Sequence, residues 1–128
     1  MNCEHISYEH MSDFEINNLV AFALGYLVKT EIEDGLCGFT KEYHEKYPNT
    51  IWAAKTDDRG EQCEAWEQMN FCSSPEEAWP ILTKMIKAGH FIAFDGDSVI
   101  CDTWHQYHDE GKELMALMIV FLKMQGGE

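Results

Sequence analysis

The sequence predicts an α+β domain, and three observations support this class. Amphipathic helical patterns occur near the beginning, in the middle and at the end of the chain. Runs of β-branched and aromatic residues separate them, and turn sequences such as Asp95-Gly96-Asp97 join those runs. The 128 residues, 45% of them hydrophobic, suffice for one domain with its own core. We therefore expect a single domain over residues 1–128, with an antiparallel or mixed sheet of about five strands covered by three helices.

Three helices are predicted from capping residues that are followed by apolar positions at helical spacing. The first begins with the capping box Ser12–Glu15, and the last is capped by Asp109. In the middle helix, Ser74 precedes a proline at the first helical position, and Glu77 stands where it would complete a second capping box. The expected helices cover residues 13–24, residues 75–88 and a C-terminal segment that Gly126-Gly127 ends.

The helical patterns also predict which side chains are buried. Trp79 falls in the apolar stripe of the middle helix, which places it in the core. Asn17 and Asn18 fall on the opposite side of the first helix from its apolar stripe, which places both in solvent.

The strands are predicted from β-forming residues between turn signals. Asp95-Gly96 between two apolar runs indicates a tight hairpin, and Asp57-Asp58-Arg59-Gly60 indicates a second turn. Residues 41–50 have no firm period and are expected to form an irregular loop. The expected strands are residues 26–32, 50–55, 63–71, 91–94 and 98–101.

The net charge of −14 restricts the partners. With 9 Lys and Arg against 23 Asp and Glu, the surface repels phosphate backbones and anionic membranes, so we expect neither direct nucleic-acid binding nor membrane binding. Carboxylates fixed on a rigid sheet can imitate the phosphates of a nucleic acid, and would then bind a basic host protein. The alternative is an ordinary solvated acidic face. The candidate partner-binding residues form two clusters: Glu31, Glu33 and Asp34, and Asp57, Asp58, Glu61, Glu64 and Glu67.

Familiar catalytic signatures are absent from the sequence. It contains no glycine-rich phosphate loop, no GxSxG and no HExxH. Five cysteines without a CxxC pair predict reduced thiols in a cytoplasmic protein, and Cys72 with a histidine as a nucleophilic pair remains only an alternative. We expect no enzyme, no cofactor and no metal. The longest apolar run, residues 114–122, is too short to span a bilayer.

Two further alternatives depend on particular side chains. A small-molecule pocket could be lined by Trp52, Trp66 or Tyr107, since aromatic side chains commonly line such sites. A metal-dependent enzyme would use Cys101, His105 and His108, because a continuous strand would place Cys101 and His105 on one face.

Three stretches of the chain resemble the NinX-like family of small bacteriophage proteins. They are Ser12-Asp13-Phe14-Glu15-Ile16-Asn17-Asn18-Leu19-Val20-Ala21, Phe71-Cys72-Ser73-Ser74-Pro75-Glu76-Glu77-Ala78-Trp79-Pro80-Ile81 and Ala116-Leu117-Met118-Ile119-Val120-Phe121-Leu122-Lys123-Met124. The resemblance implies an α-β-α sandwich and a phage-encoded accessory protein of the host cytoplasm. It implies no chemistry.

Charge, size and resemblance together predict a non-enzymatic phage protein. It is expected to bind and inhibit a host defence protein that handles nucleic acids, of the kind met in CRISPR or restriction systems. Inhibition would be steric and electrostatic, through the acidic surface. The sequence leaves homodimer formation open.

Overall fold

The computed structural model describes residues 8–29, 41–102 and 104–125. A short 3-10 turn, Tyr8–His10, precedes the first helix. The helices are α1 (Asp13–Ala23), α2 (Lys41–Lys46), α3 (Pro75–Lys87) and α4 (Glu113–Gln125). The strands are β1 (Leu27–Val28), β2 (Ile51–Ala54), β3 (Glu67–Met69), β4 (Ile92–Asp95), β5 (Ser98–Cys101) and β6 (Trp104–Tyr107).

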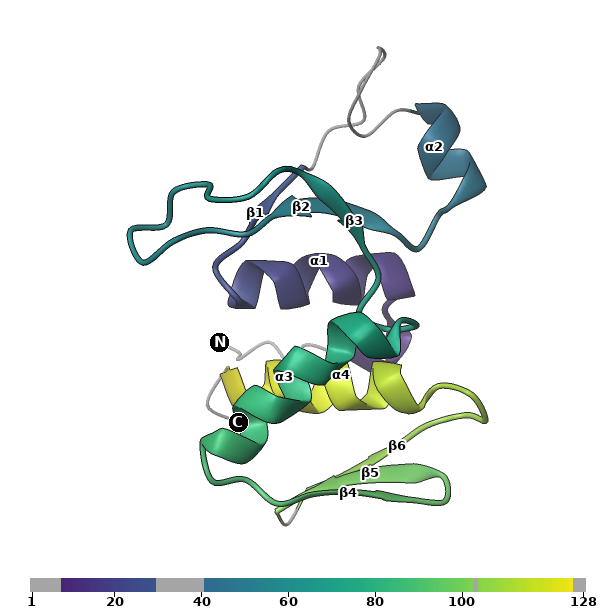
Figure 1. Cartoon of the computed structure of the whole chain (residues 1–128). Helices are drawn as coiled ribbons and strands as arrows, with labels where there is room; N and C mark the ends of the chain where they lie inside the picture. Colours follow the sequence, from purple (N-terminus) through teal and green to yellow (C-terminus); the bar gives the residue numbers. More distant parts are fainter. Residues whose placement is uncertain (1–7, 30–40, 103, 126–128) are drawn as a thin grey trace, which may run out of the picture.

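The helices α1, α3 and α4 lie between two separate sheets (Figure 1). One sheet has the order β1-β2-β3 and the other β4-β5-β6, and all their pairings are antiparallel. The α+β class is therefore confirmed, but the single sheet of about five strands covered by three helices is wrong. The layers run sheet, helices, sheet, so the α-β-α order is wrong as well.

The burial of α4 explains this layering. Seven consecutive residues, Ala116–Leu122, are buried. A helix that is apolar around most of its circumference has to be covered on every side. In the structure α4 packs against α1, α3 and the second sheet. Apolar positions at helical spacing predict one buried stripe for such a helix, so the position of the helices as the middle layer was not predicted.

Several predicted elements are confirmed nearly to the residue. The helices over 13–24 and 75–88 correspond to α1 and α3. The hairpin of 91–94 with 98–101 corresponds to β4 and β5, with Ile92 opposite Cys101 and Asp95 opposite Ser98. The strand over 50–55 corresponds to β2.

Other elements differ from the prediction. The irregular segment 41–50 contains the short helix α2, and the strand over 63–71 is reduced to β3. Of the strand over 26–32, Leu27–Val28 pairs with β2, and the part from residue 30 onward lies outside the described residues. The last helix begins at Glu113 rather than after Asp109, and β6 was not predicted.

Two predictions made for helix α3 are wrong. Trp79 is 63% exposed, because Ala78, Ile81 and Met85 form the buried face of the helix. The predicted capping box is absent: the Ser74 side chain makes no capping hydrogen bond. The Glu77 carboxylate instead accepts a hydrogen bond from the Asn70 backbone N–H at 2.5 Å. Glu77 therefore ties α3 to the end of the first sheet.

Asn17 was predicted in solvent but is completely buried. Its amide nitrogen donates to the Asn49 backbone oxygen at 2.7 Å and to the Asn70 side-chain oxygen at 2.9 Å. Its amide oxygen accepts from the Cys72 backbone N–H at 3.0 Å. One side chain thus joins α1 to the segment before β2 and to the segment between β3 and α3.

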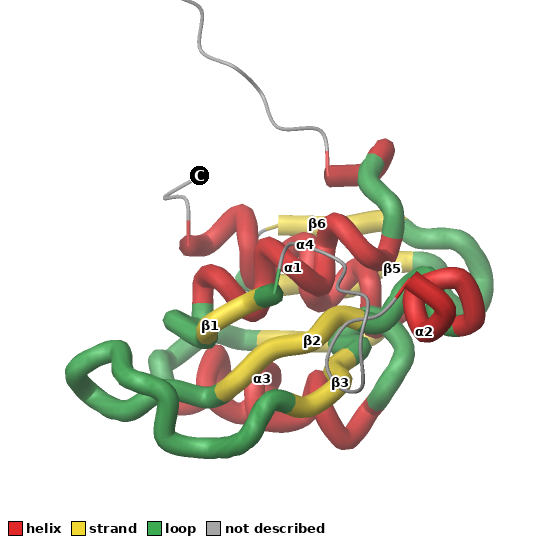
Figure 2. The backbone as a smooth tube through the Cα atoms, turned by 90° about the horizontal axis from the view of Figure 1, so that it is seen from above, coloured by secondary structure: helices red, strands yellow, loops and turns green. Residues whose placement is uncertain are grey.

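The long connection between β2 and β3 projects beyond the helices on one side of the molecule (Figures 1 and 2). Only one isolated bridge, between Thr56 and Gln62, pairs its two arms within the described residues. This connection carries four of the eight predicted partner-binding carboxylates, those of Asp57, Asp58, Glu61 and Glu64, and Glu67 follows at the start of β3.

Candidate functional site

We call the residues Asp57, Asp58, Glu61, Glu64 and Glu67 the acidic loop. All five side chains are exposed. In the part of the chain that the structure describes, no cation forms an ion pair with any of them. The five carboxylates therefore lie exposed along the β2–β3 connection and the start of β3, where the exposed Arg59 also stands. The other predicted cluster, Glu31, Glu33 and Asp34, lies outside the described residues.

Asp57 has a structural role within the acidic loop. One oxygen of its carboxylate accepts hydrogen bonds from the backbone N–H groups of Arg59 and Glu61, each at 2.9 Å. The Asp57 N–H also donates to the Glu61 carbonyl oxygen at 2.8 Å. Gly60 has φ of +80°, which a side chain would strain. These contacts hold the tip of the loop in one conformation.

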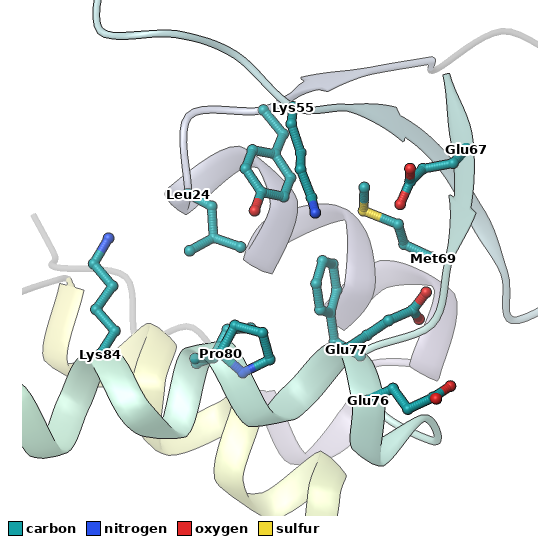
Figure 3. Close-up of a pocket in the computed structure, with 11 residues that line it drawn as sticks. Leu24, Lys55, Glu67, Met69, Glu76, Glu77, Pro80 and Lys84 are labelled. Carbon is teal, nitrogen blue, oxygen red and sulfur yellow. The ribbon is translucent and has the colours of Figure 1, made fainter. Parts of the chain in front are cut away.

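A pocket of about 340 Å³ lies between the first sheet, the end of α1 and α3 (Figure 3). Its volume is within the range of small-ligand sites. Lys55 reaches into it from the sheet side, while Glu77 and Lys84 belong to α3 (Figure 3). Glu67 belongs both to this pocket and to the acidic loop. The remaining lining residues are Leu24, Tyr26, Met69, Phe71, Glu76, Pro80 and Ile81.

Two ionisable groups of this pocket have shifted pKa values. Burial raises the pKa of the Tyr26 hydroxyl above its ordinary value. Burial also raises the pKa of the Glu77 carboxyl, and the hydrogen bond from Asn70 only partly opposes this effect. Shifted groups in a pocket are typical of functional sites, although structural networks produce them too.

The raised pKa of Glu77 predicts a pH dependence of stability. The folded protein holds this proton more tightly than the unfolded chain, so the stabilisation is present below the ordinary pKa of the carboxyl and is lost as pH rises through the raised value. In Glu77→Gln this contribution is absent. Relative to the variant, the wild type should therefore lose free energy of unfolding as pH rises from about 4.5 towards neutrality.

Urea unfolding of both proteins across this range measures the difference. Glu76→Gln, which removes an exposed carboxylate from the same turn of α3, controls for the loss of one negative charge. Parallel pH profiles for the wild type and Glu77→Gln would contradict the assignment.

The three aromatic candidates for a ligand pocket are not brought together. Trp52 lies on β2 and Trp66 directly precedes β3 in the first sheet, whereas Tyr107 lies on β6 of the second. The ammonium group of Lys29 lies 5.2 Å from the centroid of the Trp66 ring, a cation–π contact. Tyr107 borders a second hollow of about 450 Å³ beside α4. Neither tryptophan lines either of these two pockets.

The grouping of Cys101 with His105 and His108 is wrong. Cys101 pairs with Trp104 across β5 and β6, and Ile100 pairs with His105. Cys101 and His105 therefore point to opposite faces of the sheet. The prediction assumed one continuous strand, but the chain reverses after β5.

Cys101 instead lies beside His90 and Asp102, and each residue offers one donor atom within 4.8 Å of the others. The signal for this proximity was present in the predicted hairpin. Its register sets Ile92 opposite Cys101, which brings the residues before β4 close to those after β5.

Cys72 does not fit a nucleophilic role. Burial raises the pKa of its thiol to about 12, so the thiolate is scarce at neutral pH. Cys72 lies in the core cluster, where it packs as a small apolar residue.

Together, the fold and its surfaces define a small acidic α+β protein that presents carboxylates on a projecting loop. The family model described as Bacteriophage P22, NinX matches residues 7–125, and the chain therefore belongs to this bacteriophage family, as its resemblance predicted. No curated protein and no solved structure matches it. None of the helices among the described residues has the length and apolarity needed to cross a membrane.

Proposed function

We propose that this phage protein binds a basic host protein that handles nucleic acids and inhibits it without chemistry of its own. The target class is a defence factor, such as a CRISPR effector or a restriction nuclease. The acidic loop is the observation that carries this proposal. Its carboxylates would occupy the surface on which the target holds phosphates.

The charge pattern of the loop supports this function. The carboxylates of Asp58, Glu61 and Glu64 are exposed and form no ion pair with any described residue. The turn at Asp57 fixes the backbone that carries Asp58 and Glu61. Because the backbone of this turn is already ordered, binding requires little further ordering of it, and the entropic cost of association is correspondingly smaller.

The test begins with capture of host proteins at two ionic strengths. The Debye length falls from about 10 Å at 0.1 M salt to about 3 Å at 1 M salt, so a complex held by exposed charges dissociates at the higher concentration. The captured host protein should be basic and nucleic-acid-binding, and its nuclease activity should fall when the phage protein is added.

Charge reversal of the acidic loop is expected to remove most of the binding. Three exposed ion pairs at about 1 kcal/mol each correspond to about a 100-fold change in affinity. We therefore expect Asp58→Lys, Glu61→Lys and Glu64→Lys, combined in one variant, to weaken binding by about this factor in a calorimetric titration. Asp57 is left unchanged because it supports the turn.

A matched control reverses three exposed carboxylates elsewhere, with Asp95→Lys, Asp97→Lys and Glu110→Lys combined. These residues lie around the β4–β5 turn and before α4, far from the acidic loop. This control should retain most of the affinity. Equal losses in both variants would show a response to net charge alone and would contradict an interface at the loop.

The pocket beneath the first sheet favours a second function, the sequestration of a small molecule. It combines an apolar floor with Tyr26, Lys55 and Glu77. If capture yields no host protein and native mass spectrometry finds a co-purified small molecule, this second function replaces the first.

A further inference from the structure

The side chains of His90, Cys101 and Asp102 converge at the end of the second sheet farthest from the β4–β5 turn. We propose that they form a binding site for a divalent transition-metal ion of the zinc type. Imidazole, thiolate and carboxylate are the three side-chain ligands that zinc uses in proteins. This inference is independent of the acidic loop and of the inhibitor proposal.

Two of the three distances between the donor atoms are close to those that a tetrahedral ion requires, and the third, between His90 and Cys101, is within 4.8 Å. Zinc bonds of about 2.3 Å to sulfur and about 2.0–2.1 Å to nitrogen or oxygen set neighbouring ligand atoms roughly 3.3–3.6 Å apart. Nδ1 of His90 lies 2.8 Å from Oδ2 of Asp102, and Sγ of Cys101 lies 4.0 Å from the same oxygen. Shifts of about half an ångström would bring both distances into the range required.

Backbone contacts already fix the carboxylate. The second oxygen of Asp102, Oδ1, accepts a hydrogen bond from the Phe91 N–H at 2.9 Å, and the Asp102 N–H donates to the Phe91 carbonyl oxygen at 2.9 Å. Oδ2 is thereby left to face His90 and Cys101. Such a hydrogen bond to a ligating carboxylate is the support that metal sites commonly have.

The site is open on one side and closed on the other. The side chains of His90 and Asp102 are 33% and 46% exposed, which gives an ion a route from solvent. Cys101 is 2% exposed, and its sulfur lies 3.3 Å from Sδ of Met124 on α4. The three protein ligands therefore leave one coordination position for water.

Binding requires the loss of the Cys101 thiol proton and a change of tautomer at a neutral His90. The ion takes the place of the Cys101 thiol proton, which passes to solvent. It also displaces the hydrogen shared by His90 Nδ1 and Asp102 Oδ2, so that the neutral imidazole carries its proton on Nε2.

Titration of the reduced full-length protein with Co²⁺ tests the proposal, because tetrahedral cobalt reports thiolate ligation by its absorption. We expect a sulfur-to-cobalt charge-transfer band that saturates at one ion per chain and disappears when Zn²⁺ is added. Cys101→Ser should abolish the band, and Cys63→Ser, which changes an exposed thiol elsewhere, should leave it unchanged.

Asp102→Asn provides a test if the buried Cys101 variant does not fold. Asp102 has φ of +56°, which Asn also tolerates, and the amide oxygen can still accept from Phe91. We expect Asp102→Asn and His90→Gln each to weaken Co²⁺ binding by at least about tenfold. Absence of the band in the wild type, or a titration unchanged by Asp102→Asn, would overturn the proposal.

Discussion

Replacing Asn17 with alanine is expected to lower the free energy of unfolding by about 3 kcal/mol. The completely buried amide makes three hydrogen bonds, to Asn49, Asn70 and Cys72. Alanine would leave the Asn49 carbonyl oxygen and the Cys72 N–H without this partner. Each buried polar group that loses its partner costs about 1–3 kcal/mol.

Thermal and urea unfolding of Asn17→Ala measure this loss, and we expect the melting temperature to fall by roughly 10 °C. Asn18→Ala is the matched control. Among the described residues, the Asn18 amide nitrogen donates within its own helix, to the Phe14 carbonyl oxygen at 3.1 Å, so we expect a loss below about 1 kcal/mol. Similar losses in the two variants would mean that the buried network contributes little.

Phe121→Ala in α4 should be still more destabilising, by about 4 kcal/mol. Phe121 is among the largest fully buried side chains and belongs to the central helix on which both halves of the molecule pack. Truncating it removes apolar burial and leaves a cavity that its neighbours fill only in part. Such a loss is a large part of the stability of a typical small domain.

Phe22→Ala is the control for Phe121→Ala, because the Phe22 side chain on α1 is 76% exposed. We expect a change within about 0.5 kcal/mol at this position. If the urea midpoint changes while the slope of unfolding free energy against urea concentration stays the same, the stability difference between the two variants comes from the native core. If Phe121→Ala were as stable as Phe22→Ala, the central position of α4 would be wrong.

Local signals predicted most of the elements but not their arrangement. The capping box at Ser12 forms as expected, with hydrogen bonds in both directions between Ser12 and Glu15. The Asp95-Gly96 turn likewise forms its hairpin. Both features depend on residues a few positions apart. The separation into two sheets depends on which elements cover α4, and this is a property of long-range packing.

The buried position of Asn17 shows the same limit. Helical periodicity placed it opposite the apolar stripe, but its partners come from residues 32, 53 and 55 positions away. Periodicity reports the polarity of a face and does not show whether another segment will supply partners for a polar side chain.

The candidate sites were predicted unevenly. The residues of the acidic loop were identified because a turn sequence and a local run of carboxylates are visible in the chain. The pocket between the first sheet and α3 could not be found, since its lining comes from four separate segments. The convergence of His90 with Cys101 and Asp102 depends on the register of the β4–β5 hairpin, and the hairpin was predicted without its residue pairing.

The position of α4 also determines when the protein can fold during synthesis. This helix is the last of the described elements to be made, yet it lies at the centre of the core. While the ribosome is still extending the chain, the inner faces of α1 and the second sheet have no central helix to pack against. The nascent chain therefore acquires its tertiary structure only after residues 113–125 have emerged. Until then its uncovered apolar surfaces are exposed to chaperones, proteases and other nascent chains.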